Sequence, residues 1–266
     1  MSETNLGGPQ VTGKMYLFKK PELLSPEKHG HLGVAPLAEP FKFCATAKAI
    51  PLTISEIPAA AKHYPVVFAS PEQPTPLAIV SVVDEVNLFV DDKGNWERRT
   101  YVPAYVRRYP FGVAKEENSD RFAIVVDSEF EGLTADAEVR LFDDKEASEF
   151  TKKAIDFSKG YEDDRALTSQ MVEVLKKHEI LAVQTAQYTP ANGGDPVGFA
   201  QYVGVDEPKL KALSDEAFLE LRKSGLLPIL FIQLSSLSNW RSLIGRRAER
   251  FQLTEDQFLT PVTLAS

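Results

Sequence analysis

The spacing of apolar residues changes near residue 145, and this change constrains the fold more than any other feature of the chain. Before it, short runs rich in Val, Ile and Phe are bounded by Pro, Asp, Asn and Gly, at 63–69, 76–83, 87–90 and 121–127. Such runs are typical of β-strands. After it, Phe150, Ala154, Phe157 and Tyr161 recur at spacings of three and four, which indicates a helix. Strands and helices are therefore not interleaved regularly along the chain, which favours an α+β fold.

The helical stripe continues to His178, so we expect one bent helix or two helices over 146–178. Runs typical of β-strands occur again at 181–188 and 196–205, and the loop between them is typical of a wide hairpin. Helices are expected to follow over 207–249. Together these patterns predict one α+β domain with a mostly antiparallel sheet, strands concentrated in 41–127 and 181–205, and C-terminal helices.

Residues that favour helix ends and tight turns punctuate these segments. Helix starts are expected at Ser55, Asp206 and Ser214, a helix stop at Gly225, and a hairpin turn with positive φ at Gly94. The helix at Ser55 is expected to end before Pro65. The last helix is expected to run unbroken over about 227–249.

The chain of 266 residues is long enough to bury a large core without disulfides. Residues 1–14 are Gly-rich and polar and predict a flexible N-terminal tail. The domain is expected to cover 15–250, and 251–266 to form a C-terminal tail that Phe251, Leu253 and Phe258 could dock.

Composition argues against several classes of function. The net charge of −8 disfavours phosphate-backbone binding, so no nucleic acid partner is expected. One cysteine, Cys44, and four scattered histidines predict no metal site and no cofactor, and Cys44 is expected to be a small buried hydrophobe. The longest apolar run, 226–232, is far shorter than the ~20 residues of a membrane span. The polar N-terminus has no secretory pattern, so a cytoplasmic location is expected.

The stretch "YVPAYVRRYPF", residues 101–111, is the best candidate for a binding surface. Its prolines predict a helix of about two turns, with Tyr105 and Tyr109 on one face and Arg107 and Arg108 pointing outward. Tyrosine hydroxyls and guanidinium groups suit a carboxylate, a phosphate or a peptide C-terminus. Trp96 is expected close by. The alternative is a short scaffold helix whose arginines pair with nearby acids.

Two further polar residues are candidates for a ligand-binding role. Gln233 is the one polar member of the stripe made by Leu230, Leu237, Trp240 and Ile244, so its amide either ties down a strand or faces a small cavity. His63 precedes the strand run at 63–69 and is expected to bond across a sheet edge or to line a pocket.

Several segments together resemble the bacterial SapC family. They are "HYPVVFA", "NLFVDDKGNW", "YVPAYVRRYPF", "LFDD", "GFAQYVGVDEPKLKALSDEAFLELRKSGLLPIL" and "LSSLSNWRSLI". They occur in the same order as in the family, and the resemblance covers the chain from about 15 to 247. The resemblance implies an accessory protein linked to outer-membrane nutrient uptake or to surface layers, and it identifies no catalytic residues. Similar proteins often have His where this chain has Gln233, which argues against a histidine mechanism shared by the whole family.

Two hypotheses from different classes follow. The first is a non-catalytic accessory protein that binds a peptide, an acidic small molecule or a protein partner near Tyr105–Arg108. The second is an enzyme that uses Tyr, His and Arg. A deep pocket with His63, or with a carboxylate facing Arg107, would favour the enzyme, and a shallow aromatic patch would favour binding.

Overall fold

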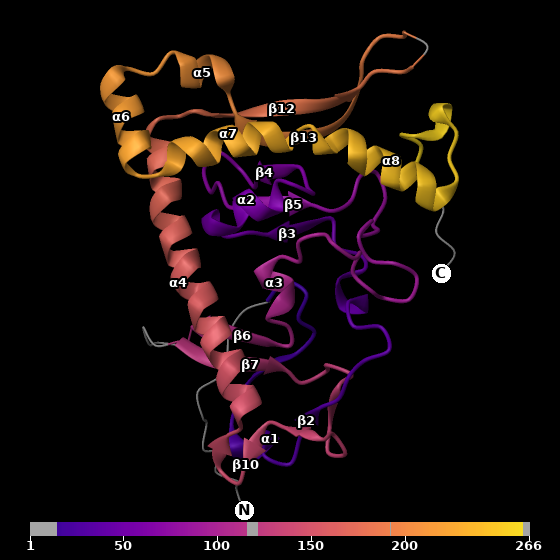
Figure 1. Ribbon diagram of the computed structural model, residues 1–266, viewed down its shortest axis with the longest axis vertical. Helices are drawn as coiled ribbons and strands as arrows, with labels where there is room; N and C mark the ends of the chain where they lie inside the picture. The colour runs from indigo at the N-terminus through magenta and orange to yellow at the C-terminus, as the bar shows by residue number, and fades with distance from the viewer. Residues whose placement is uncertain (1–14, 116–121, 192, 263–266) are drawn as a thin grey trace, which may run out of the picture. The chain divides into compact units, whose positions relative to one another are not determined.

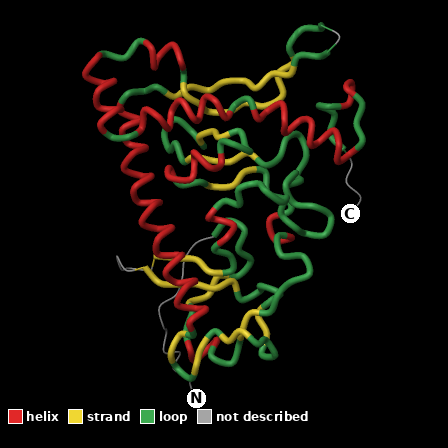
Figure 2. Tube along the Cα trace, viewed as in Figure 1, coloured by secondary structure: helices red, strands yellow, loops and turns green. Residues whose placement is uncertain are grey.

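Antiparallel sheets and helices build the chain in two compact units. The structure is a computed structural model, and its description covers residues 15–115, 122–191 and 193–262 (Figures 1 and 2). The first unit comprises the described residues of Met1–Pro40 and Arg107–Asp163, and the second those of Phe41–Val106 and Asp164–Ser266. The fold class is α+β with antiparallel sheets and C-terminal helices, which confirms the prediction. The expected tail at 1–14 lies outside the described residues, and the predicted domain limits of 15–250 stay a prediction.

The second unit is organised around a five-stranded antiparallel sheet of order β12-β13-β4-β5-β3. Its strands are β3 (Ala49–Pro51), β4 (Val66–Phe68), β5 (Pro76–Ile79), β12 (Leu181–Tyr188) and β13 (Val197–Val205). The central strand β4 is apolar and buried, with no residue more than 3% exposed, and α7 packs against it. Figure 1 shows α7 running alongside the β12-β13 hairpin.

The helices of this unit are short, and side chains cap the first turns of some of them. They are η1 (Lys42–Cys44), η2 (Ile54–Glu56), α2 (Ile57–Ala60), α5 (Glu207–Lys211), α6 (Asp215–Lys223), α7 (Leu226–Ser236), α8 (Asn239–Phe251) and η3 (Glu255–Gln257). Asp206 and Ser214 accept hydrogen bonds from backbone N–H groups in the first turns of α5 and α6, as predicted. Gly225 has a φ of 78°, the left-handed conformation expected at a helix stop.

Four expected elements differ from the structure. The helix of about two turns expected between Pro103 and Pro110 is the single turn α3 (Ala104–Arg107). The helix expected over 227–249 is broken into α7 and α8, because the Ser236 and Ser238 hydroxyls bond back to carbonyls of the preceding turn. The helix predicted to start at Ser55 is capped by Thr53 instead and ends at Ala60. The run at 87–90 is not a strand, because the buried Asn87 side chain bonds the Cys44 carbonyl and the Phe89 N–H in place of a ladder.

The first unit contains small antiparallel sheets. One has the order β1-β7-β6, with β1 (Pro21–Leu23), β6 (Phe111–Lys115) and β7 (Phe122–Asp127); another has the order β8-β2-β9, with β2 (Gly33–Val34), β8 (Leu133–Thr134) and β9 (Val139–Arg140). The pair β10 (Phe142–Asp143) and β11 (Glu146–Ala147) and the helix α1 (Pro26–His29) complete it. Its core contains Phe111, Val126, Leu141 and Phe142.

Strands outside the expected ranges depend on distant partners. β1 and β2 lie before residue 41, and they form because they pair with β7, β8 and β9, which local patterns cannot reveal. Two helices each contain a boundary between the units, α3 (Ala104–Arg107) and α4 (Glu149–Lys177). α4 is a single helix of 29 residues that passes through Gly160. None of the helices in the described part of the chain is long and apolar enough to cross a membrane.

Candidate functional site

A tight turn in the second unit organises the first wall of the candidate site. Asp91 Oδ1 accepts hydrogen bonds from the backbone N–H of Lys93 at 2.9 Å and of Asn95 at 2.8 Å. Gly94 has a φ of 65°, and Val90 and Trp96 form an isolated antiparallel bridge across the turn, so the predicted hairpin turn is confirmed. The backbone hydrogen bond from Asn95 lowers the pKa of Asp91. The turn therefore presents a fixed carboxylate and a buried tryptophan.

An aromatic cluster of Phe41, Tyr64, Phe89 and Trp96 lies beneath this turn. The Trp96 ring meets Phe41 edge-on at 5.7 Å and stacks on Phe89 at 6.4 Å, while Tyr64 packs edge-on against Phe89 at 4.6 Å. Trp96 is only 6% exposed, and its Nε1 donates to Thr100 Oγ1 at 3.0 Å. The aromatic cluster is thus a rigid floor with its polar groups satisfied.

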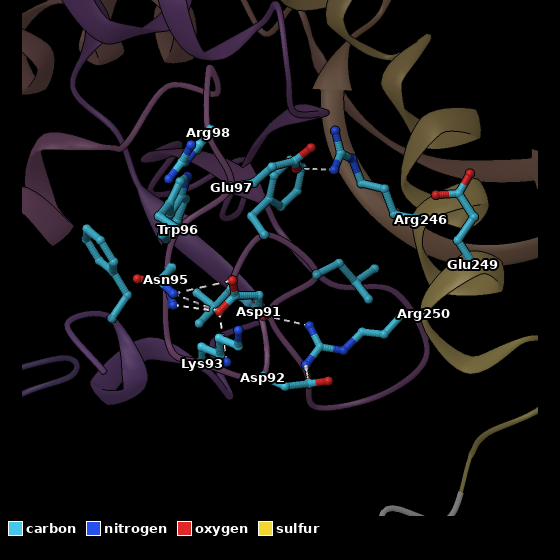
Figure 3. A pocket seen from close by; sticks show the side chains of 14 residues that line it. Asp91, Asp92, Lys93, Asn95, Trp96, Glu97, Arg98, Arg246, Glu249 and Arg250 are labelled. Carbon is cyan, nitrogen blue, oxygen red and sulfur yellow. Dashed lines mark hydrogen bonds and ion pairs between the residues drawn. The ribbon is translucent and has the colours of Figure 1, made fainter. Parts of the chain in front are cut away.

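Helix α8 supplies the opposite wall through Arg246, Glu249 and Arg250, whose spacings of three and four place them on one helical face. The Arg246 guanidinium lies 4.4 Å from the centre of the Phe89 ring and pairs with Glu97. Arg250 donates to the Val90 carbonyl at 2.5 Å and to Asp92 at 2.7 Å (Figure 3). These bonds tie α8 to the turn and orient its charges.

Between the two walls lies a hollow of about 890 Å³. It is lined by Phe41, Leu88, Phe89, Val90, Asp91, Asp92, Lys93, Asn95, Trp96, Glu97, Arg98, Arg246, Glu249 and Arg250. The charged lining residues comprise four acids and four bases, so the hollow offers both signs of charge above an aromatic floor. Arg98 is exposed and forms no ion pair with any described residue, which leaves its donors available.

Two of the residues predicted from the sequence lie at or near this hollow. Trp96 lines it, and His63 lies close enough to Arg246 and Glu97 to feel both charges. Burial, and then the Arg246 charge, lower the pKa of His63, so the neutral imidazole is favoured. His63 is not among the lining residues, and its ring packs edge-on against Tyr64 at 6.0 Å.

Gln233 is a structural residue within the same unit. Its side chain is fully buried, and its Nε2 donates to the Val66 carbonyl at 2.8 Å. Its Oε1 accepts from the Val205 N–H at 3.2 Å. The amide thus ties β4 and β13 to α7, which is the first of the two roles expected for it.

The stretch at 101–111 was expected to be a binding surface, but two of its four candidate residues are buried. Tyr105 is 8% exposed and Arg108 is 6% exposed, so neither stands free at a surface. Arg108 Nη1 lies 3.3 Å from Glu162, and its guanidinium stacks 4.5 Å from the Tyr161 ring centre. The expectation of an outward Arg108 is therefore wrong, because a charged and aromatic environment within the first unit holds this guanidinium inside.

The other two members of that stretch remain partly accessible. Arg107 is exposed and lies 5.1 Å from the centre of the Phe157 ring. Tyr109 donates to Asp127 at 3.0 Å, and the buried carboxylate also accepts from the Lys19 and Lys20 N–H groups. A ligand-binding role for Arg107 and Tyr109 stays a prediction.

Residues missed by sequence reasoning make most of the site. The sequence patterns did not single out Asp92, Glu97, Arg246 or Arg250 as candidates. The one local signal was the spacing of four between the two arginines on an amphipathic helix. Their partners are more than 140 positions away in sequence, at separations of 149 for Glu97 and 158 for Asp92.

The described lining residues of the hollow include no serine, cysteine or histidine, although four carboxylates and a lysine are among them. Cys44 is fully buried, as predicted, its Sγ lies 3.2 Å from the Phe41 carbonyl, and burial raises the pKa of its thiol to about 12. No group of three or more His, Cys, Asp or Glu residues in the described ranges is arranged to hold a metal ion.

The fold and the hollow define an α+β protein with a polar pocket on an aromatic floor. Residues 24–243 match the SapC family, and the chain belongs to that family. The turn that carries Trp96 falls within the matched segment, whereas Arg246, Glu249 and Arg250 follow it. No curated protein matches the chain, and no solved structure does.

Proposed function

We propose that this SapC-family protein is a non-catalytic accessory protein that binds a peptide or an acidic small molecule in the hollow between the Asp91 turn and α8. The observation that carries this proposal is the combination of a rigid aromatic floor with charged walls of both signs. Most ligand sites combine an apolar surface with a few placed polar groups in this way. The volume of about 890 Å³ suits a short peptide segment or a small organic acid.

The charges favour a ligand that carries at least one carboxylate. Arg246 and Arg250 are partly neutralised by Glu97 and Asp92, so they serve chiefly to shape the wall. Arg98 keeps its donors, and guanidinium groups bind carboxylates in a bidentate fashion. Glu249 and Asp91 offer acceptors for ammonium or amide N–H groups, which a peptide would supply.

The composition of the lining supports binding rather than catalysis. The side chains that act most often as nucleophiles or general bases are Ser, Cys and His, although Asp, Glu and Lys serve as well. The described lining has no Ser, Cys or His, its carboxylates Glu97 and Asp92 are held in ion pairs with Arg246 and Arg250, and the nearby His63 lies outside it. The alternative, an enzyme with a Tyr, Arg and His pocket, would require His63 to reach a bound substrate.

The biological context in the proposal follows from the family resemblance. The protein would act in the cytoplasm of a bacterium as an accessory to outer-membrane nutrient uptake or to a surface-layer system. In that context the ligand is a peptide or organic acid, or an acidic segment of a protein partner.

A direct test compares Arg98→Gln with Arg99→Gln. Both arginines are exposed neighbours, and only Arg98 lines the hollow. Fluorescein-labelled octapeptides of acidic, neutral and basic composition, together with citrate as a competitor, serve as probes. We expect the acidic peptides to bind and Arg98→Gln to raise their Kd about tenfold or more, because a charged hydrogen bond contributes ~1.5–3 kcal/mol. Arg99→Gln should leave the Kd unchanged.

Two results would contradict the proposal. The first is that no probe binds with a Kd below about 1 mM. The second is that an acidic peptide binds equally well to both variants, which would place its site away from the hollow.

A further inference from the structure

The strand β12 forms one edge of the five-stranded sheet. The sheet order begins with β12, and β13 separates it from β4. In Figure 1 β12 lies outermost among the strands of this sheet. The outer side of an edge strand presents backbone N–H and C=O groups that no strand of the same sheet can satisfy, so it is a template for another strand.

The β12-β13 hairpin is almost free of charge. Charged residues make up 26% of the chain, yet between Glu179 and Asp206 the only one is Asp195. β12 itself, "LAVQTAQY", has no charged residue and no proline. Edge strands of monomeric proteins are usually guarded by lysines, prolines or inward charges. One irregularity is present, a register shift between Ala186 and Gln187, and it leaves the run from Leu181 to Ala186 regular.

The same strand exposes a β-branched apolar side chain. Val183 is 62% exposed, the largest fraction among the large hydrophobic residues that the structure describes as exposed. Thr185 and Gln187 follow it at alternate positions and are also exposed. β-branched residues are typical of paired strands because they pack well against cross-strand neighbours. The exposed row of Val183, Thr185 and Gln187 is therefore suited to contact a further strand.

We propose that β12 pairs antiparallel with β12 of a second copy of this chain, so that two five-stranded sheets become one continuous sheet. The absence of charge favours a second copy over a different partner. A two-fold axis through an antiparallel strand pair makes each residue face the residue equally far on the other side of the axis, so only residues near the axis approach their own copies, and a charge there would face a like charge. β12 avoids this repulsion along its whole length, whereas recognition of a different chain is usually aided by complementary charges.

The first experiment places one charge on the edge and the same charge one strand inward. Thr185 on β12 lies directly opposite Gln201 on β13, and both are exposed. The oligomeric state of the full chain is measured by analytical ultracentrifugation over a range of concentrations. We expect a dimer whose Kd rises at least about tenfold in Thr185→Lys, because Thr185 lies at the middle of β12, so full overlap of the two strands places both lysines near the axis. The matched control Gln201→Lys should keep the dimer.

A charge-swap experiment separates strand pairing from misfolding. Thr185→Glu should also weaken self-association, since two carboxylates then meet. Mixing the Thr185→Lys and Thr185→Glu proteins should restore a dimer made of one copy of each, which native mass spectrometry detects by mass. Two unfolded variants could not restore a dimer in this way.

The outcomes decide the proposal. A wild-type chain that stays monomeric at about 100 μM overturns it, since specific dimers form well below this concentration. A dimer that Thr185→Lys leaves unchanged, or that Gln201→Lys disrupts equally, also overturns it. A heterodimer restored by mixing supports antiparallel pairing of β12 about a two-fold axis.

Discussion

At the scale of single residues, neighbouring arginines of the same stretch differ in what they do. Arg108 is buried beside Glu162 and stacks on Tyr161, whereas Arg107 is exposed over Phe157. Arg108→Ala would leave the largely buried Glu162 without this partner, and loss of one member of a buried pair costs about 3–5 kcal/mol. We therefore expect Arg108→Ala to lower the free energy of unfolding by about that amount, measured by urea denaturation.

Arg107→Ala is the matched control. Exposed side chains usually change stability by less than about 0.5 kcal/mol, so its urea midpoint should stay close to that of the wild type. Equal midpoints for both variants would show that Arg108 contributes nothing through Glu162 and Tyr161. A binding defect in a folded Arg107→Ala protein would instead support the ligand-binding role predicted for Arg107.

At the scale of elements, α8 holds the segment that follows it through a fully buried arginine. Arg247 pairs with Asp84 at 2.6 Å and donates to the carbonyls of Phe258 at 2.7 Å and Thr260 at 2.6 Å. Asp84 also accepts from the Val262 N–H at 2.9 Å. Several charged hydrogen bonds therefore dock the described part of the chain after α8, including Phe258, which was expected to help dock it.

A second prediction compares two ion pairs that α8 makes through its arginines, Arg247 with Asp84 and Arg250 with Asp92. Asp84→Ala leaves the buried Arg247 guanidinium without its carboxylate, and we expect a loss of about 3–5 kcal/mol in the free energy of unfolding. Asp92→Ala removes an exposed partner of Arg250, with a side chain 93% exposed, and should cost less than about 1 kcal/mol. Hydrogen exchange of residues 255–262 should rise in Asp84→Ala alone. Equal exchange in both variants would mean that the buried pair does not hold this segment.

At the scale of the whole molecule, each unit contains a histidine whose pKa lies below its usual value. In the first unit burial lowers the pKa of His29, which is 3% exposed, and in the second burial lowers the pKa of His63. Between these lowered values and the unfolded pKa of about 6.5, the unfolded chain binds more protons than the folded chain. Stability should therefore fall as the pH drops through this window.

We expect the free energy of unfolding, measured by urea denaturation, to decrease between about pH 7.5 and pH 5.5, with a slope of at most about 1.4 kcal/mol per pH unit for each histidine. His29→Asn and His63→Asn should each reduce that slope, because each removes one of the two histidines whose pKa is lowered by burial. A free energy of unfolding that stays constant or rises as the pH falls would contradict the sign of both pKa shifts.

Local chemistry made much of the fold predictable. The change of period near residue 145 predicted strands before α4 and the helix itself, and Asp206, Ser214 and Gly94 act at the positions that their side chains or φ angles favour. The break between α7 and α8 was not predicted. It involves a hydrogen bond from the Ser236 hydroxyl to the Gln233 carbonyl, and the apolar spacing of the segment gives no sign of this bond. Membership of the SapC family was likewise readable from the order of its segments.

The sequence by itself determined the α+β class, the caps, the Gly94 turn and the need of Gln233 for buried partners, because each depends on residues close together in the chain or on one side chain. Only the tertiary structure decided that the Arg108 side chain faces inward and which residues line the hollow. Glu97 meets Arg246 across 149 positions, and Arg250 meets Val90 across 160. Such contacts depend on the path of the whole backbone, since the energy of each pair is realised only after packing has brought the two residues together.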